Sequence, residues 1–358
     1  MTTNSGIDNT INYLDDSDYS LSSDEDQYGY FTDDDEFNET PLIDSIKNKE
    51  FNKFLKLLSK NNLKELIFDN ELEMKINPLQ VALKFYTDFN DINYITKLLE
   101  TKYYNINDCI LFSVFHNDCY NYFKNINKDM YTYIDSNNDN ILLWASKYSN
   151  LKIVYDIYDN IENHNLNNNQ GLNCFLSAAQ NQDSQSIFEI INFFIDKNKN
   201  NFINSIDKNK DNFLFLLENN INVKANDTYK SIIVKLLVNN GININNINNQ
   251  GKNILITSIE NSNFKNWKSI YDYTFFYIIS KIDLNIYDYE NDSVLNHCIY
   301  QLNNELKLIT KKNFNLLKKE FKYFRNIINL IIENKELTNN EMELLKEFKK
   351  SVSNYNLI

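Results

Sequence analysis

The sequence contains very little glycine and proline: 5 and 2 residues in a chain of 358. Collagen-like chains, glycine-rich linkers and β-sandwiches with many tight turns need more of both. Hydrophobic residues nevertheless make up 42% and charged residues 24%, so most of the chain can form a packed core. The length exceeds that of one ordinary core, and we therefore expect two domains or one extended array.

Residues that support catalysis are also scarce. The chain has three histidines and one arginine: His116, His164, His297 and Arg325. Cys119 near His116 and Cys298 beside His297 are the nearest cysteine–histidine pairs, and neither has a third group in view to orient the base. A Gly-x-Ser-x-Gly motif and a glycine-rich phosphate loop are both lacking. We expect no enzymatic activity and no cofactor.

The cysteines are few and widely spaced. Cys109, Cys119, Cys174 and Cys298 form no Cys-x-x-Cys pair, and Cys109, His116 and Cys119 lack a fourth metal ligand, so no metal site is expected. The first ten residues show no basic, apolar secretory signal. Apolar runs fall short of the roughly 18 residues that a membrane span requires. These features predict an intracellular, cytoplasmic or nuclear protein with reduced thiols that is neither secreted nor membrane-bound.

Negative charge is concentrated at one end. The net charge is −13, and residues 1–46 hold 13 acidic residues without any lysine or arginine. Residues 1–38 have few aliphatic side chains and are predicted to be a disordered acidic tail. Ser22, Ser23 and Thr32 precede acidic residues at the spacing that acid-directed kinases prefer, which makes them candidate phosphorylation sites. The rest of the chain has equal numbers of acidic and basic residues and one arginine, a composition that does not suit nucleic-acid binding.

Two charged segments leave alternatives open. Aromatic residues interleave the acidic tail, which could dock on a basic apolar groove or simply keep the protein in solution. The basic stretch Lys307–Arg325 has apolar residues at helical spacing. It is either a helix with a solvated lysine face or a docking site for an acidic partner, of which the tail is one candidate.

Internal repeats organise the remaining sequence. The tetrapeptide Asn-Asn-Gln-Gly occurs at Asn168–Gly171 and at Asn248–Gly251, each time followed by one variable residue, an asparagine and an apolar run. When the alignment of these two copies is extended toward both ends of the chain, apolar residues recur at intervals of 31 to 42 residues: Leu42, Leu79, Leu111, Leu142, Phe175, Phe213, Leu255 and Leu295. A period of this length predicts stacked supersecondary units.

The residues at fixed offsets resemble the ankyrin repeat family. Glu39–Leu42 and Ile76–Leu79 resemble its Thr-Pro-Leu motif and contain both prolines of the chain. Gly241 resembles the glycine that ends the second helix, while Gly171 and Gly251 resemble the finger-loop glycine. The family's Leu-His pair is missing. The resemblance covers residues 39–336, about eight units, and implies an all-α, ankyrin-type helix-turn-helix solenoid. A Thr338–Glu341 capping box predicts a closing helix and tail over residues 337–358.

The resemblance also implies a function. Such arrays bind protein partners through the concave face and the finger loops, so we expect a monomeric, non-catalytic scaffold or adaptor. The candidate contact residues are Asn138, Asp139, Asn169, Gln170, Asn249, Gln250, Asn291 and Asp292. At each position the alternative is a turn residue that tolerates left-handed backbone. Two other functions remain open: a substrate-recruiting subunit of a ubiquitin ligase, and an acidic-tail chaperone or mimic for basic proteins.

Overall fold

A computed structural model describes residues 40–58, 62–72, 74–86, 91–197, 202–220, 223, 228–261, 276–307 and 314–353. Contacts divide the chain into Met1–Thr40 and Pro41–Ile358, and the account below concerns the second unit. The expected tail at 1–38, with Ser22, Ser23 and Thr32, lies outside the described residues.

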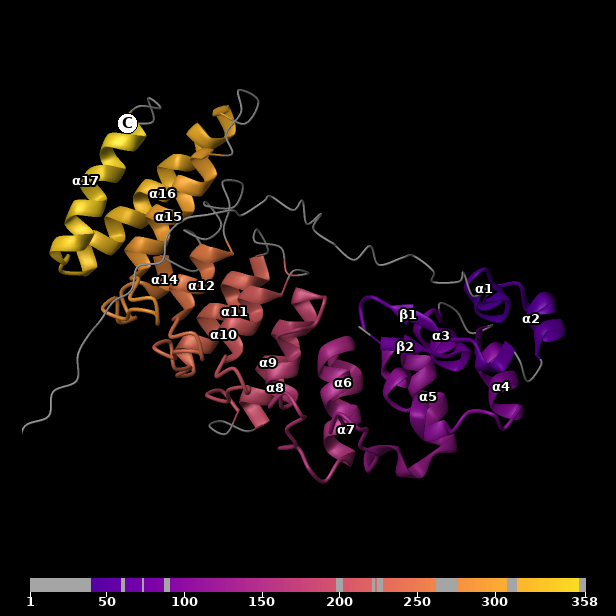
Figure 1. Ribbon diagram of the computed structural model, residues 1–358. Coiled ribbons are helices and arrows are strands. Elements are labelled where there is room, and N and C mark those ends of the chain that lie inside the picture. The colour runs from indigo at the N-terminus through magenta and orange to yellow at the C-terminus, as the bar shows by residue number, and fades with distance from the viewer. Residues whose placement is uncertain are drawn as a thin grey trace, which may run out of the picture. The chain divides into compact units, whose positions relative to one another are not determined.

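The second unit is mostly helical, and its helices come in consecutive pairs (Figure 1). The first members of the pairs are α1 (Pro41–Lys47), α3 (Pro78–Lys84), the 3₁₀ helix η4 (Leu111–Phe115), α6 (Ile141–Tyr148), α8 (Cys174–Ala178), α10 (Phe213–Asn219), α12 (Ile254–Glu260) and α15 (Val294–Lys307). The second members are α2 (Phe51–Leu57), α4 (Ile92–Glu100), α5 (Asn117–Ile126), α7 (Leu151–Asn160), α9 (Ser184–Lys197), α11 (Thr228–Asn239), α14 (Phe276–Ile278) and α16 (Phe314–Asn334). Short 3₁₀ helices η1 (Asn62–Lys64), η3 (Ile106–Cys109) and η5 (Lys128–Tyr131) lie between them.

Each first helix packs against the first helix of the next pair, from α1 through to α15. The second helices α7, α9 and α11 pack in the same manner. Most of the aligned apolar residues are fully buried in these contacts, for example Leu79, Leu142 and Leu255. One pair cannot bury its apolar face alone, so stacking supplies the core. The chain is therefore a helical repeat solenoid, as the sequence predicts.

Asparagine starts most of the first helices. Asn77, Asn140, Asn173 and Asn253 each precede the first helical residue and accept the backbone N–H three residues ahead. Such caps satisfy one of the free N–H groups at a helix start. In the sixth pair Asn212 is the cap, so Leu214 rather than Phe213 stands at the aligned position. The prediction was one residue off there because both side chains are buried and apolar.

The third pair is irregular, and its sequence contains neither proline nor glycine. Its first element, η4, is a 3₁₀ helix rather than an α-helix. A feature that the sequence did not predict precedes α3: strands β1 (Ile67–Asp69) and β2 (Met74–Ile76) form an antiparallel hairpin with Ile67 opposite Ile76. Lys84 of α3 forms ion pairs with the hairpin, since its Nζ lies 2.7 Å from the Asp69 carboxylate and 2.8 Å from the Glu71 carboxylate.

The last pair is long. Its second helix, α16, has 21 residues and begins at Phe314. Helix α17 (Asn339–Ser353) follows and packs on α15. Its predicted capping box is present, since Thr338 N–H donates to Glu341 Oε2 at 2.9 Å and Glu341 N–H donates to Thr338 Oγ1 at 3.2 Å. The same carboxylate forms a fully buried ion pair with Lys335 at 2.6 Å.

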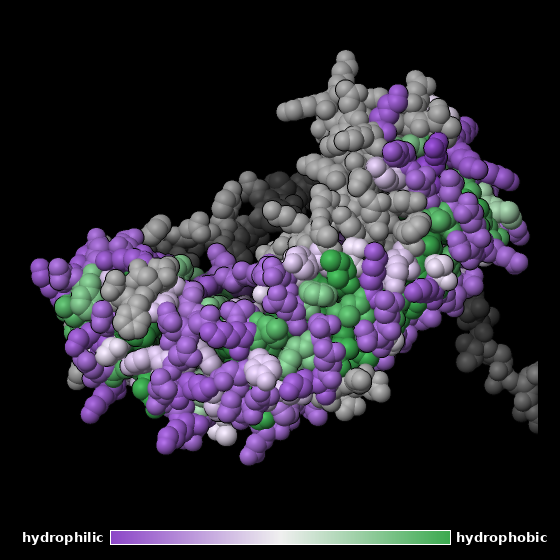
Figure 2. All heavy atoms as spheres, turned by 180° about the vertical axis from the view of Figure 1, so that it is seen from behind, coloured by the Kyte–Doolittle hydropathy of each residue, from purple (hydrophilic) through white to green (hydrophobic). Residues whose placement is uncertain are grey.

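Polar side chains cover much of the surface. On the face drawn in Figure 2, hydrophilic side chains predominate and apolar side chains form smaller areas between them. This distribution suits an array whose apolar residues face neighbouring repeats. Within the described part of the chain, no helix combines the length and apolar character needed to cross a bilayer.

Candidate functional site

Five turns that precede first helices share one geometry, and we call them the finger tips: residues 135–139, 168–172, 207–211, 248–252 and 288–292. Each begins with aspartate or asparagine: Asp135, Asn168, Asp207, Asn248 and Asp288. In every tip the Oδ1 atom of this first residue accepts hydrogen bonds from the backbone N–H groups two and four residues later, at 2.8 to 3.1 Å. The short polar side chain thus closes the turn.

The fourth residue of each tip has a left-handed backbone. The residues are Asn138, Gly171, Lys210, Gly251 and Asn291, with φ between 60° and 84°. At two tips a side chain would also collide with the next tip. A Cβ on Gly171 would lie 2.8 Å from the Lys208 nitrogen, and one on Gly251 would lie 2.8 Å from Tyr289. These contacts explain glycine at these two tips.

Backbone hydrogen bonds join each finger tip to the next. The Asn169 N–H donates to the Asn137 carbonyl at 2.8 Å, and the Lys208 N–H donates to the Gln170 carbonyl at 2.9 Å. In the same way, the Asn249 N–H donates to the Asn209 carbonyl at 2.8 Å, and the Tyr289 N–H donates to the Gln250 carbonyl at 3.4 Å. The tips therefore form a continuous row whose members support one another.

All eight predicted contact residues lie on the finger tips. Several also hold the row together: Asn138, Asn169 and Asn249 donate to backbone carbonyls of another loop at 2.5, 3.1 and 2.9 Å. Asp139 accepts from Asn168, and Asp292 accepts from Asn296. By contrast, the exposed side chains of Gln170 and Gln250 make no hydrogen bond to the residues that the structure describes. As partner contacts, all eight remain predictions.

A groove runs between the finger tips and the first helices, and we define it by three hollows. The first, about 310 Å³, lies between the β1–β2 hairpin and α6, with Leu72, Met74, Trp144 and Tyr148 in its wall. The second, about 340 Å³, shares Leu72, Lys147, Gln170 and Gln180 with the first. The third, about 360 Å³, shares Asn219 with the second and reaches Gln250 and Glu260. The shared walls make the three hollows one continuous surface.

Aromatic side chains gather at the hairpin end of this groove. The ring centroids of Trp144 and Tyr148 are 5.1 Å apart, and Phe115 of η4 lies 5.1 Å from Tyr148. Phe112 lies 5.1 Å from Trp144 and is buried, whereas the other three rings are half-buried. Partly exposed tryptophan and tyrosine beside a hollow are typical anchors of protein interfaces. Sequence reasoning missed this cluster, although the adjacent pair of aromatics on α6 was visible.

Asp139 of the first finger tip lines the same hollow as Trp144. Burial and the nearby Asp135 carboxylate raise the pKa of the Asp139 carboxyl group, while the hydrogen bond from Asn168 and the charge of Lys147 oppose the rise. The Asn168 Nδ2 lies 2.9 Å from Asp139 Oδ1. A predicted contact residue therefore lies in the wall of the hollow that holds Trp144 and Tyr148.

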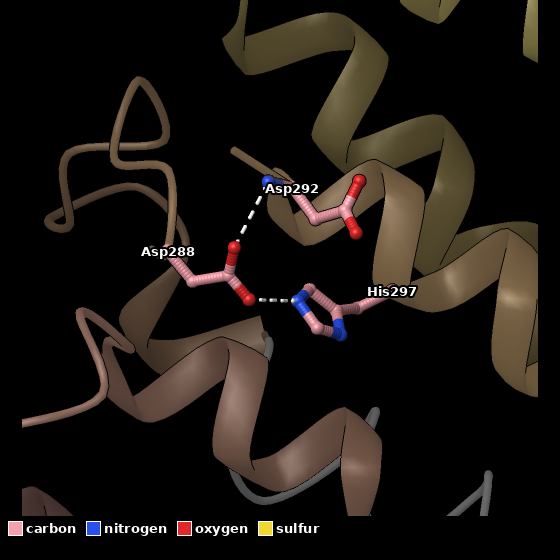
Figure 3. Close-up of side chains that lie close together, drawn as sticks. All are labelled: Asp288, Asp292 and His297. Carbon is pink, nitrogen blue, oxygen red and sulfur yellow. Dashed lines mark hydrogen bonds and ion pairs between the residues drawn. The ribbon is translucent and has the colours of Figure 1, made fainter. Parts of the chain in front are cut away.

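A second polar cluster lies at the last finger tip (Figure 3). Asp288, Asp292 and His297 bring potential ligand atoms within 4.8 Å of one another. The Asp288 carboxylate is already occupied: Oδ1 accepts two N–H groups of its own tip, and Oδ2 accepts from His297 Nε2 at 2.9 Å. Burial would raise the pKa of Asp288, but these hydrogen bonds lower it below its ordinary value. We therefore interpret the cluster as a hydrogen-bonded link between the last finger tip and α15, and we assign no metal to it.

The four cysteines are all buried. Burial raises the pKa of the Cys174 thiol to about 12 and raises those of Cys119 and Cys298 further. Thiols with raised pKa values are poor nucleophiles at neutral pH. His116, the third member of the rejected metal set, has its Nε2 3.2 Å from the Lys84 carbonyl.

Comparisons with known proteins give a limited result. No family model matches the sequence, and no curated protein matches it. Among solved structures, the chain is similar to the ankyrin repeat domain of Bcl-3, described as a unique member of the IkappaB protein family. The identity is 15% and the TM-score 0.37, over 73% of this chain and 94% of that one. The assignment of a repeat solenoid rests on the paired helices and finger tips of this chain itself.

Proposed function

We propose that this chain is a degenerate ankyrin-type repeat protein that acts inside the cell as a monomeric, non-catalytic scaffold or adaptor. Its partners bind in the groove and on the finger tips. The observation that carries the proposal is the half-buried pair Trp144 and Tyr148 in the wall of the first hollow, with the half-buried ring of Phe115 packed against Tyr148. Rings of this kind contribute most of the free energy at protein interfaces.

The surroundings of the cluster support this use. The finger tips beside it form a hydrogen-bonded row, and the Trp144 ring packs against Phe112, Phe115 and Tyr148. A rigid anchor loses little conformational entropy on binding, which favours affinity. The groove also lies on the face that ankyrin-type arrays use for partners, and the finger tips carry exposed amides beside it.

The test compares partner recovery by full-length variants in quantitative affinity purification from cells. Trp144→Ala combined with Tyr148→Ala should reduce the recovery of specific partners at least tenfold, since interface anchors commonly contribute about 2 kcal/mol or more. The matched control is Tyr155→Ala on α7, which is 48% exposed and lines none of the three hollows. Loss with the control, or full recovery with the double variant, would contradict the proposal.

A further inference from the structure

The lining of the groove indicates what kind of partner it fits. Beyond the aromatic end, its walls consist largely of amide side chains, among them Gln170, Gln180, Asn219, Gln250 and Asn261. An amide offers two donors and an acceptor, the complement of a peptide group. An extended segment exposes its peptide groups, whereas a helix has already satisfied its own internally.

Three of these amides are available to a ligand. The side chains of Gln170, Gln180 and Gln250 make no hydrogen bond to other described residues. Gln170 and Gln180 line both the first and the second hollow, and Gln250 lines the third. By contrast, Asn219 and Asn261 already bond each other at 2.9 Å. The free glutamines are thus distributed along the groove instead of being collected at one end.

Most of the charges along the groove are compensated within the protein. Lys147 and Asp139 line the same hollow, Glu71 lies 2.8 Å from Lys84, and Glu260 lies 2.8 Å from Lys252. Asp211 of the third hollow makes no ion pair with a described residue. A groove with so small a net charge does not select a strongly acidic or basic ligand. It suits the uncharged backbone of a polypeptide and disfavours a nucleic-acid strand, which requires a basic surface.

We propose that the groove binds an extended segment of a partner protein. Its peptide groups hydrogen-bond to Gln170, Gln180 and Gln250, and one large apolar side chain enters the hollow beside Trp144 and Leu72. This inference rests on the proposed function and adds the conformation and chemistry of the partner. Main-chain hydrogen bonds supply affinity with little sequence preference, and the aromatic end supplies the specificity.

The experiment selects binders from a displayed library of random 12-residue peptides on the full-length protein and measures the best one by calorimetry. Gln170→Met with Gln180→Met preserves side-chain volume and removes the amides. We expect this pair to weaken binding about tenfold, as two lost hydrogen bonds imply. Trp144→Ala should weaken it by at least thirtyfold. The matched control is Gln185→Met on α9, whose exposed amide bonds only Glu189 at 2.8 Å.

Changes in the peptide complete the test. Methylation of alternate backbone nitrogens should weaken binding, and a helix-stabilising crosslink should also weaken it. Tighter binding of the crosslinked helix, with Trp144→Ala still disruptive, would overturn the extended mode and leave the proposed function intact. Failure to select any peptide would also overturn the inference, while recovery of folded partners through Trp144 and Tyr148 would preserve the function. Indifference of binding to every groove variant would overturn both.

Discussion

Replacement of Gly171 by alanine is expected to destabilise the array much more than the same change at Gly241. Both glycines have positive φ, at 84° and 86°, so a Cβ costs about 1 kcal/mol of backbone strain at either one. At Gly241 no atom lies within 4 Å of the new carbon. At Gly171 the carbon would lie 2.8 Å from the Lys208 nitrogen, whose N–H bonds the Gln170 carbonyl.

The collision at Gly171 adds to the strain. The next finger tip must move away, and the hydrogen bond between the two tips is lost or stretched, which costs about 1 to 2 kcal/mol. We therefore expect about 2 to 3 kcal/mol for Gly171→Ala and about 1 kcal/mol for Gly241→Ala. Gly171→Asn separates the two contributions, because asparagine tolerates this backbone at Asn138 and Asn291 but still carries a Cβ.

The assay is urea unfolding followed by circular dichroism, combined with hydrogen exchange of the finger tips. Exchange is needed because repeat arrays can unfold in segments. Gly171→Ala should speed exchange at tips 168–172 and 207–211 together, and Gly171→Asn should fall between the two alanine variants. Equal losses for both alanine variants would refute the reasoning that neighbouring tips support each other through close backbone contact.

Three further outcomes are expected. Asp139→Ala should remove the acceptor that Asn168 Nδ2 reaches at 2.9 Å and speed hydrogen exchange at tip 168–172, while Asp139→Asn should largely preserve this contact; unchanged exchange in the alanine variant would contradict its role. Lys84→Met should speed hydrogen exchange in the β1–β2 hairpin and leave α12 unchanged, because the buried carboxylate of Asp69 and the exposed carboxylate of Glu71 lose their cation; unchanged hairpin exchange would refute that role. Burial alone would raise the pKa of Glu341, but its hydrogen bonds lower it below the ordinary value. The free energy that this carboxylate contributes to folding is therefore complete above pH about 4.5 and is lost as the pH falls through the lowered pKa. Glu341→Gln should therefore flatten the acid limb of a stability–pH curve, and an unaltered limb would contradict this.

Much of the helical framework could be predicted from the sequence. The prolines at Pro41 and Pro78 and the glycines at Gly171, Gly241 and Gly251 stand where local backbone geometry demands them. Such residues are informative because their constraints act within a few positions. The one-residue error at Phe213 arose where no such constraint applied, since either register buries an apolar side chain.

The positions of the asparagines, rather than their number, indicate where helices begin and turns close. Asparagine is abundant throughout the sequence, so its count alone does not locate the helix starts. In the structure asparagines cap first helices, close finger tips and bridge neighbouring loops, for instance from Asn246 to the Lys210 carbonyl at 2.6 Å. The position before each apolar run, as in Asn140 and Asn173, would have revealed the caps.

The candidate site was less predictable than the fold. The finger tips follow from local turn chemistry, but the aromatic cluster depends on how η4 and α6 are rotated against each other. The β1–β2 hairpin depends on Lys84, which is 15 residues beyond Asp69 in the sequence. Strands of three residues carry too little pattern to be recognised, and a tertiary ion pair selects their conformation.

The most direct test of the account is site-specific photo-crosslinking in cells. A benzophenone amino acid replaces Tyr148 in the groove or, in a matched protein, Tyr155 on α7. We predict that position 148 crosslinks to a specific partner, that position 155 does not, and that Trp144→Ala abolishes the crosslink at 148. Crosslinks to the same partner from position 155 alone would contradict the claim that the groove beside Trp144 is the binding surface.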